Sequence, residues 1–175
     1  MPRVSIVLPV YNGSKYIRES LDSIVNQTYK DWELIIVNDC STDNTLSIVE
    51  EYVIKDERIK VINNEENQKL PKSLNIGFRL TKGEYLTWTS DDNMFCEFAL
   101  QRMVDCLDAK SEYSMVCADY ECINSEGKTI DSVTDFDELK LFYRNCVGAC
   151  FLYRREVLDY VGEYDPTLFL IEDYD

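Results

Sequence analysis

The sequence contains no histidine among its 175 residues. Histidine is the usual general base near neutral pH and the commonest side-chain metal ligand. Its absence excludes a Ser-His-Asp or Cys-His mechanism carried by this chain alone. A general base would have to be a carboxylate. A bound metal would have oxygen ligands, which favours Mg²⁺, Mn²⁺ or Ca²⁺ over Zn²⁺.

Glycine is also scarce, with only six residues. Neither GxGxxG nor GxxxxGK[ST] follows the first apolar run. These glycine-rich loops bring backbone N–H groups close to phosphates, so their absence argues against a dinucleotide-binding Rossmann domain and a P-loop NTPase. Phosphates would need cationic side chains or a metal instead.

Basic residues and long apolar runs are in short supply. Eighteen Lys and Arg stand against 33 Asp and Glu, a net charge of −15, which argues against nucleic acid as a partner. No run reaches the roughly 20 apolar residues of a membrane helix, and no signal peptide opens the chain. The seven cysteines form no CxxC pair, so we expect them to be small core residues in a reducing compartment. We expect a soluble, cytoplasmic protein.

Apolar runs with the pattern of strands alternate with amphipathic stretches in the first half of the chain. This rhythm is typical of βαβ units and predicts an α/β fold with a mostly parallel sheet flanked by helices. Ser14 is expected to cap the first helix, and the third helix is expected to end near Gly83. The predicted strands cover residues 4–10, 32–38, 59–63 and 84–89.

The second half changes rhythm and predicts a smaller, mixed part. We interpret residues 1–175 as one domain, with residues 1–110 binding a nucleotide and residues 111–175 forming the mixed part. The predicted elements are a strand over 113–124, an antiparallel return at 129–133, a short helix over 137–145, a strand over 149–154 and a helix over 155–162 that Gly162 ends.

Acidic residues follow two of the predicted strands, where parallel sheets bind ligands. Asp91 and Asp92 are either a solvated helix cap or ligands of a hard cation that holds diphosphate oxygens. Asp39 either accepts a hydrogen bond from the imide N–H of uracil or thymine, or belongs to an Asx turn in which Ser41 or Thr42 caps the next helix.

Three segments, in this order, resemble the family 2 glycosyltransferases, which have the GT-A fold. They are "VSIVLPVYNGSKYIRESLDSIVNQTYKDWELIIVNDCSTDNT", "NIGFRLTKGEYLTWTSDDNM" and "NCVGACFLYRREVLDYVGEYDPTLFLIEDYD". The resemblance covers nearly the whole chain. It implies a Rossmann-like, mostly parallel central sheet and a donor that is a nucleoside-diphosphate sugar.

On the donor side, the resemblance implies a uracil pocket after the first strand. Pro9, Val10 and Tyr11 would line this pocket, with Tyr11 stacking on the base. Asp39 would bind the edge of the base, and Lys69 would lie near the nucleotide.

On the reacting side, the resemblance implies a metal site and a base. Asp91 would lie near the ribose and diphosphate, and Asp92 would be the main metal ligand, although either aspartate could hold the ion. Asp173 matches the general base, and Glu172 would help to position the acceptor. Gly148 would let the backbone approach the sugars.

The activity implied is a metal-dependent, inverting transfer of a sugar, with Mn²⁺ or Mg²⁺ as cofactor. The donor would be a UDP-sugar, or a TDP-sugar. The acceptor would be a saccharide or a lipid-linked molecule, in the synthesis of cell-surface polysaccharide or glycoconjugate. The protein would be cytoplasmic or peripheral at the cytoplasmic membrane, and its oligomeric state is open.

Two departures from the family pattern keep alternatives open. The acidic motif reads Thr89, Ser90, Asp91, Asp92, where many relatives have D-x-D starting at the position of Thr89. The chain stops at Asp175, where family members continue, so we expect a C-terminal truncation. A non-catalytic nucleotide-sugar binding module, or an inactive fragment, is the alternative. A sugar-phosphate nucleotidyltransferase would need a glycine-rich loop that "LPVYNG" does not provide.

Overall fold

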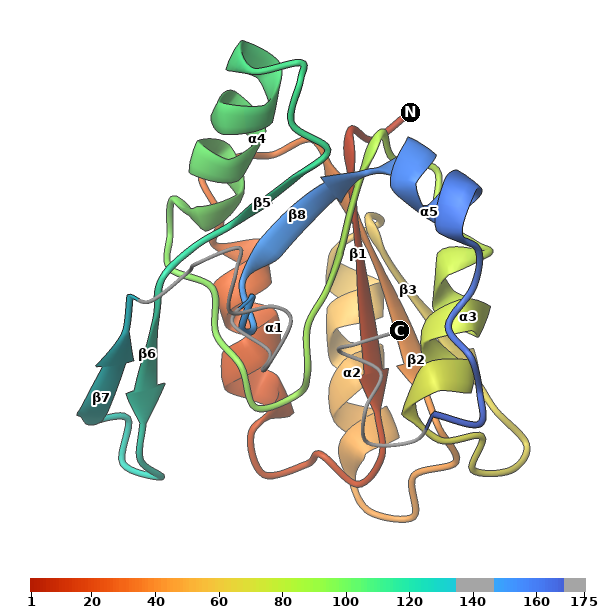
Figure 1. Cartoon of the computed structure of the whole chain (residues 1–175). Coiled ribbons are helices and arrows are strands. Elements are labelled where there is room, and N and C mark those ends of the chain that lie inside the picture. Colours follow the sequence, from red (N-terminus) through yellow and green to blue (C-terminus); the bar gives the residue numbers. More distant parts are fainter. Residues whose placement is uncertain (135–146, 169–175) are drawn as a thin grey trace.

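A six-stranded sheet forms the centre of the computed structural model, which describes residues 1–134 and 147–168 (Figure 1). β1 to β4 run parallel, and β8 runs antiparallel to both β4 and β5. The prediction of an α/β fold with a mostly parallel sheet is confirmed. In spatial order the strands are β3 (Ile59–Asn63), β2 (Trp32–Asn38), β1 (Val4–Val10), β4 (Tyr85–Trp88), β8 (Phe151–Arg154) and β5 (Met115–Cys117).

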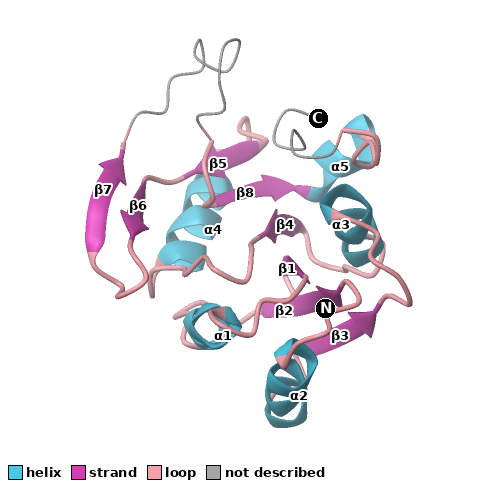
Figure 2. Cartoon of the chain, turned by 90° about the horizontal axis from the view of Figure 1, so that it is seen from below, coloured by secondary structure: helices cyan, strands magenta, loops and turns pink. Residues whose placement is uncertain are grey.

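Helices cover both faces of this sheet (Figure 2). α1 (Ile17–Val25), α2 (Thr45–Lys55) and α4 (Ala99–Ala109) pack on one face. α3 (Leu70–Phe78) and α5 (Arg155–Val161) pack on the other. Among the described residues, no helix is long and apolar enough to cross a membrane.

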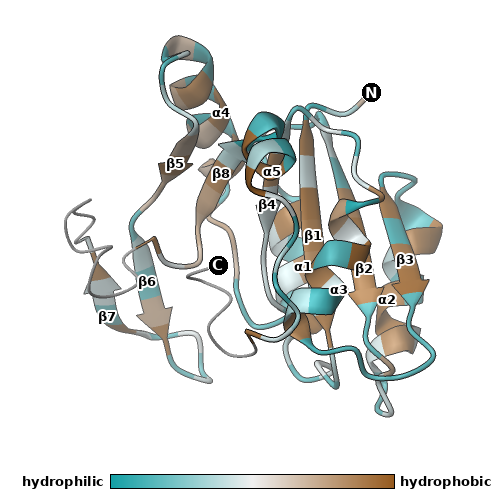
Figure 3. Ribbon diagram, turned by 45° about the vertical axis from the view of Figure 1, so that its right-hand side comes forward, coloured by the Kyte–Doolittle hydropathy of each residue, from teal (hydrophilic) through white to brown (hydrophobic). Residues whose placement is uncertain are grey.

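The two central strands are buried along their whole length because helices cover both of their faces. All seven residues of β1 and all seven of β2 are buried. Ile6 and Leu34 face the α1 side, and Val7 and Ile35 face the α3 side. Burying one such side chain stabilises a fold by about 1.5–3 kcal/mol. Figure 3 shows the resulting apolar sheet between polar loops.

The buried carboxylate of Glu33 holds the loop that leads into β4. Glu33 is 4% exposed, and its Oε1 accepts hydrogen bonds from Ser5 Oγ at 2.8 Å and from the Lys82 N–H at 2.6 Å. The Gly83 N–H donates to Ser5 Oγ at 2.8 Å. A Cβ at Gly83 would lie 2.7 Å from the Ser5 nitrogen, so only glycine allows this close approach.

The helix ends differ from three of the predictions. α1 begins at Ile17, and the Gly13 carbonyl accepts the Ile17 N–H, so Ser14 is not the cap. α3 ends at Phe78, before Gly83, because Thr81 Oγ1 donates to the Phe78 carbonyl. α2 follows Asn44, and neither Ser41 nor Thr42 caps it.

The predicted strand over 113–124 is two strands in two sheets. β5 pairs with β8, and then β6 (Tyr120–Ile123) forms a separate hairpin with β7 (Thr129–Val133). Ala118 and Asp119, both exposed, separate them. The predicted return at 129–133 is confirmed as β7. The helix predicted over 137–145 lies outside the described residues.

The expectation that most cysteines belong to the core is wrong. Of the six described cysteines, Cys96 is exposed and the other five are partly exposed. All six are free thiols. Cys150 comes nearest to the expectation, since it packs against the core and its burial raises the pKa of the thiol to about 11.

An ionic cluster at the amino edge of the sheet ties α4 to β1. Both oxygens of Asp108 accept hydrogen bonds from Arg3, at 2.8 and 2.9 Å, and Oδ1 also accepts one from the Tyr85 hydroxyl at 2.6 Å. These bonds to Arg3 and Tyr85 lower the pKa of Asp108 from 3.8 to about 2. The Asp108 side chain is 41% exposed, so solvent screens much of this interaction.

We expect Asp108→Asn to lower the free energy of unfolding at neutral pH by about 1 kcal/mol. Because the folded pKa is depressed, Asp108 stabilises the fold above pH 3.8, and this contribution is lost as the pH falls through about 2. Urea unfolding at several pH values measures both effects. Asp105→Asn, on the exposed side of the same helix, is the control. An unchanged acid profile in Asp108→Asn would contradict the assignment.

Candidate functional site

The strand order reverses direction between β1 and β4, and this point is where open α/β sheets bind ligands. The Thr89 N–H donates to the Val7 carbonyl at 3.0 Å. The backbone N–H and C=O groups of Val7 therefore point towards β4, and the backbone of Pro9, two residues further along, has the same orientation. Proline has no N–H to continue this ladder. The two chains can therefore separate beyond Thr89, at the carboxyl edge of the sheet.

Asp39 lies directly after β2 and is held by the loop that follows β3. Its Oδ1 accepts hydrogen bonds from Asn64 Nδ2 at 2.7 Å and from the Gln68 N–H at 2.8 Å. Its Oδ2 accepts the Lys69 N–H at 2.9 Å. Asp39 is only 4% exposed. We call Asp39 together with Asn64, Gln68 and Lys69 the base clamp.

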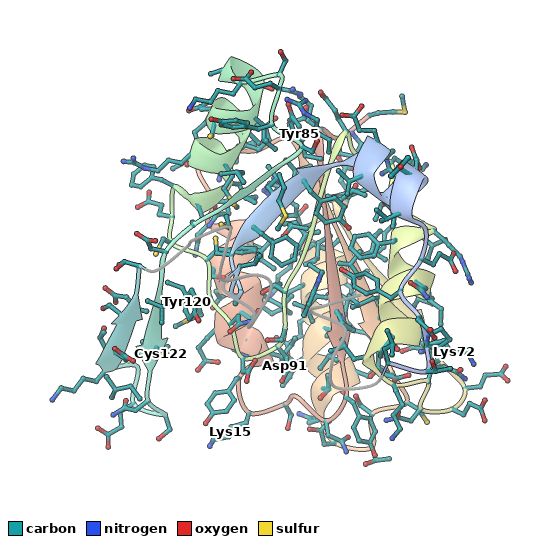
Figure 4. All side chains as sticks on the ribbon, viewed as in Figure 1. Lys15, Lys72, Tyr85, Asp91, Tyr120 and Cys122 are labelled. Atoms are coloured by element: carbon teal, nitrogen blue, oxygen red, sulfur yellow. The ribbon has the colours of Figure 1, made fainter. Side chains whose placement is uncertain are left out.

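Asp91 follows β4 and packs against the loop that follows β1. A Cβ added to Gly13 would lie 2.3 Å from Asp91 Oδ2, so glycine is what lets the carboxylate approach. Figure 4 shows Asp91 at the edge of the sheet where β1 ends. Burial raises the pKa of Asp91, and the charges of Asp92 and Asp43 raise it further.

Asp92 is exposed and accepts a hydrogen bond from the Ser90 hydroxyl. Asp43 completes the acidic group. Its carboxylate accepts bonds from Thr45 and from the Ser14 N–H. Desolvation alone would raise its pKa, but these bonds outweigh that effect and lower it. Asp43, Asp91 and Asp92 are the acidic group of this site.

The loops after β1 and β2 are joined by Asn12. Its Oδ1 accepts the Thr42 N–H at 2.8 Å and the Asp43 N–H at 3.3 Å, and its own N–H donates to Ser41 Oγ at 3.0 Å. Asn12 has φ of 57°, a left-handed conformation that asparagine adopts more readily than most residues. The sequence places Asn12 after a strand but does not reveal that it fixes Asp43.

α1 holds the loop that carries Asp91 and Asp92. Ser20 Oγ donates to the Ser90 carbonyl at 3.1 Å, and Ser23 Oγ accepts the Phe95 N–H at 3.1 Å. Gln27, with no exposed surface, donates to the Cys96 carbonyl at 2.8 Å and accepts the Leu100 N–H at 3.0 Å. The acidic loop is thus fixed by two side chains of α1 and by Gln27, just beyond that helix.

The other predicted donor-side residues lie at the same edge. Pro9 and Val10 are buried in β1, and Val10 pairs with Asn38 at the end of β2. Tyr11 is 52% exposed, immediately beyond them. Lys69, with φ of 69°, contributes its backbone N–H to the base clamp.

Gly148 has a structural reason to be glycine besides the predicted approach to sugars. Its φ is 71°, and a Cβ there would lie 2.3 Å from the Tyr120 ring. Glu172 and Asp173, the predicted catalytic carboxylates, lie outside the described residues.

A preformed metal cage is not present in residues 1–134 and 147–168, because no group of three or more His, Cys, Asp or Glu side chains converges there. Asp91 and Asp92 nevertheless supply hard oxygen donors, the kind that Mg²⁺ and Mn²⁺ prefer. Neither forms an ion pair with a cation in the described part of the chain. The donor set fits an ion that obtains its other ligands from a bound diphosphate.

Comparisons with known proteins show which family and fold this chain resembles. The model of glycosyl transferase family 2 matches residues 5–162. An uncharacterized glycosyltransferase of Haemophilus influenzae is 37% identical over 170 residues, which cover 89% of this chain and 53% of that protein. One from Rickettsia bellii is 32% identical over 187 residues, covering 99% and 26%.

Two solved structures extend the likeness to three dimensions. S. aureus TarS 1-349 in complex with UDP has a TM-score of 0.83 and 26% identity, covering 98% of this chain and 53% of that one. The mannosyltransferase PcManGT of Pyrobaculum calidifontis, with GDP-Man and Mn²⁺, has a TM-score of 0.73 at 22% identity, covering 94% and 48%, and shows the fold alone. The chain spans about a quarter to a half of the length of these relatives.

We expect Asp39→Asn to lower the free energy of unfolding by about 1–3 kcal/mol, because an amide NH₂ would face an N–H donor of the clamp. Glu65→Gln, an exposed charge change in the same loop, is the matched control and should be neutral. Urea unfolding measures both. Equal stability of the two variants would contradict the described clamp.

Proposed function

Because the chain belongs to glycosyl transferase family 2, we propose that it transfers a sugar from a nucleoside-diphosphate sugar, with UDP as the nucleotide. One observation carries the proposal. The ends of β1, β2 and β4 bring the base clamp and the acidic group to the same edge of the sheet, at its switch point. One group can hold a base, and the other can hold a metal-bound diphosphate.

The hydrogen bonds already made by Asp39 favour uracil. A carboxylate offers about four lone-pair sites, and the clamp uses two on Oδ1 and one on Oδ2. One acceptor site therefore remains. Uracil and thymine present a single ring N–H between two carbonyl groups. Guanine presents two adjacent donors, and cytosine presents an acceptor at that ring position. Exposed Tyr11 lies one strand away and can stack on the ring.

The acidic group favours a divalent cation as cofactor, Mn²⁺ or Mg²⁺. A bound diphosphate would add negative charge beside Asp91 and Asp92, which have no described cation partner. A divalent ion would neutralise the charge that develops on the leaving diphosphate. We assign Asp92, the more exposed carboxylate, as main ligand, with Asp91 buried against Gly13 and directed towards the ribose and diphosphate.

The reaction would be one displacement with inversion at the anomeric carbon. The acceptor oxygen forms a bond to that carbon while the carbon–oxygen bond to the diphosphate breaks, and the electron pair leaves with the diphosphate. Asp173 takes the hydroxyl proton, and Glu172 helps to position the acceptor. The absence of histidine from this chain agrees with a carboxylate as base.

The acceptor and the setting belong to the proposal as well. We infer a saccharide or lipid-linked acceptor and a role in cell-surface glycan synthesis. The six free thiols support a reducing, cytosolic compartment. A second candidate is a nucleotide-sugar binding module without transfer. Both candidates bind the donor, so product formation on an added acceptor separates them.

Isothermal titration of UDP, with and without Mn²⁺, tests the metal site. We expect Mn²⁺ to strengthen UDP binding. In the presence of Mn²⁺, Asp92→Asn should raise the Kd for UDP by about tenfold or more, a loss of about 1.4 kcal/mol. Asp159→Asn, on exposed α5, carries the same charge change and should bind like the original chain. Equal affinities with and without Mn²⁺ would argue against a metal-bound diphosphate.

Competition among nucleotides tests the base clamp. We expect UDP to bind at least about tenfold more tightly than GDP or CDP, because one hydrogen bond to a charged acceptor is worth about 1.5–3 kcal/mol. Asp39→Ala should abolish this preference, whereas Glu65→Gln should keep it. GDP binding as tight as UDP would show that the remaining acceptor site of Asp39 does not select the base.

A further inference from the structure

Beyond the strands, polar side chains take over the connection between the loops that follow β1 and β2. The backbone ladder of these strands ends with the bond from the Asp39 N–H to the Val10 carbonyl, at 2.8 Å. Both chains then pass through a left-handed residue, Asn12 with φ of 57° and Cys40 with φ of 63°. Strand pairing needs extended backbone with negative φ, so the ladder stops at the same level on both sides.

Ser41 joins the two loops just past this level. Its Oγ accepts the Asn12 N–H at 3.0 Å, and its own N–H donates to Asn38 Oδ1 at 3.3 Å. Asn38 is the last residue of β2 and is 3% exposed, and its Nδ2 donates to Asn63 Oδ1 at 2.9 Å. We call Asn12, Ser41, Asn38 and Asn63 the polar belt. It crosses the carboxyl ends of β1, β2 and β3, which are neighbours in the sheet (Figure 3).

The polar belt runs directly behind the residues proposed to hold the base. Each of its asparagines is next in sequence to one of them. These neighbours are Tyr11, Asp39 and Asn64. Ser41 connects the β1 side of the belt to the β2 side, so its two bonds link the backbone of Tyr11 to that of Asp39.

The Asn12 side chain strengthens the belt without depending on the Ser41 hydroxyl. Its Oδ1 accepts the Thr42 N–H at 2.8 Å, the Thr42 hydroxyl at 3.3 Å and the Asp43 N–H at 3.3 Å. The two loops therefore stay joined when the hydroxyl of Ser41 is removed. The group that loses its partner is the amide of the peptide bond between Tyr11 and Asn12.

Stacking and edge recognition make different demands on this geometry. Stacking tolerates sideways movement, because every base presents a π-face. A hydrogen bond to the edge of the ring depends on direction and weakens steeply once its angle falls below about 120°. A uracil stacked on Tyr11 would therefore keep its bond to Asp39 only while the ring and the carboxylate stay in register. A small displacement would cost base selectivity before it costs stacking.

We propose that Ser41 is a positioning residue for base recognition, which holds the peptide of Tyr11 in a fixed place relative to Asp39. This role rests on the proposed function, because it presumes a uridine nucleotide between those two side chains. Ser41 acts through the backbone of Asn12 and the side chain of Asn38, and needs no contact with the nucleotide.

Calorimetric competition between UDP and CDP, with Mn²⁺ present, measures this role. In Ser41→Ala the Kd for UDP should rise by about three- to tenfold, because a hydrogen bond to a charged acceptor is worth about tenfold or more. The Kd for CDP should stay within about twofold, since stacking is retained. The preference for UDP should therefore fall, whereas a general loss of structure would weaken both nucleotides together.

Three further variants make the test specific. Ser41→Thr keeps the hydroxyl on a partly exposed side chain and should restore the preference to within about twofold. Asn63→Ala cuts the far end of the polar belt and should lower the preference in the same direction by less. Ser125→Ala, which changes an exposed serine in the turn between β6 and β7, is the matched control and should behave like the original chain.

The outcomes separate this role from the proposed function. If Ser41→Ala weakens UDP and CDP equally, or leaves the preference unchanged, the positioning role is overturned. If Ser41→Ala does not fold, the ratio of the two affinities in Asn63→Ala decides in the same way. If the original chain binds no UDP, or binds UDP and CDP alike, the proposed function fails first, and this role with it.

Discussion

The parallel pairing of β1 with β2 is the constraint on which the rest of the structure depends. The register runs without a slip from Val4 opposite Trp32 to Val10 opposite Asn38. Since both strands are buried on both faces, a shift by one residue would turn core side chains and carry Asp39 away from the edge. The Asp39 N–H donates to the Val10 carbonyl at 2.8 Å. The hydrogen bonds between β1 and β2 therefore also fix the position of Asp39, the residue proposed to bind the base.

Each half of the site is braced by one helix, by polar side chains that are themselves buried. Ser20 of α1 and Gln27, two residues beyond that helix, are 1% and 0% exposed and hold the backbone of the acidic loop. Asn75 of α3 holds the backbone of Tyr164 in the same manner, and Ser73 of that helix accepts a hydrogen bond from Asn64 of the base clamp. A buried polar group is costly unless bonded, so these bonds allow few alternative loop positions. The loops owe their geometry to the helices.

The sequence predicts the central elements well because burial on both faces leaves a strong apolar signal, as in residues 4–10 and 32–38. It does less well where a polar residue has a tertiary partner. Ser14 has the chemistry of a helix cap, yet its N–H is taken by Asp43, and the Gly13 carbonyl begins α1 instead. Asp39 lies where the pattern places it, but its bonds to the base clamp join parts of the chain that no local pattern connects.

Charge explains why this edge of the sheet would need both a metal and an ordered backbone. The chain carries a net charge of −15, and burial together with the nearby charges of Asp92 and Asp43 raises the pKa of Asp91 at the edge where the diphosphate is proposed to lie. Like charges at close range oppose one another, so a cation between Asp91, Asp92 and the diphosphate would favour the binding that the proposed function requires. The sequence has only six glycines and no glycine-rich phosphate loop after β1, the motif that would gather backbone N–H groups around a phosphate. Two backbone N–H groups, those of Gln68 and Lys69, donate instead to Asp39. With the bond from Asn64, they leave that carboxylate one acceptor site. Under the proposed function, the protein itself would therefore select the base of the donor rather than its phosphates.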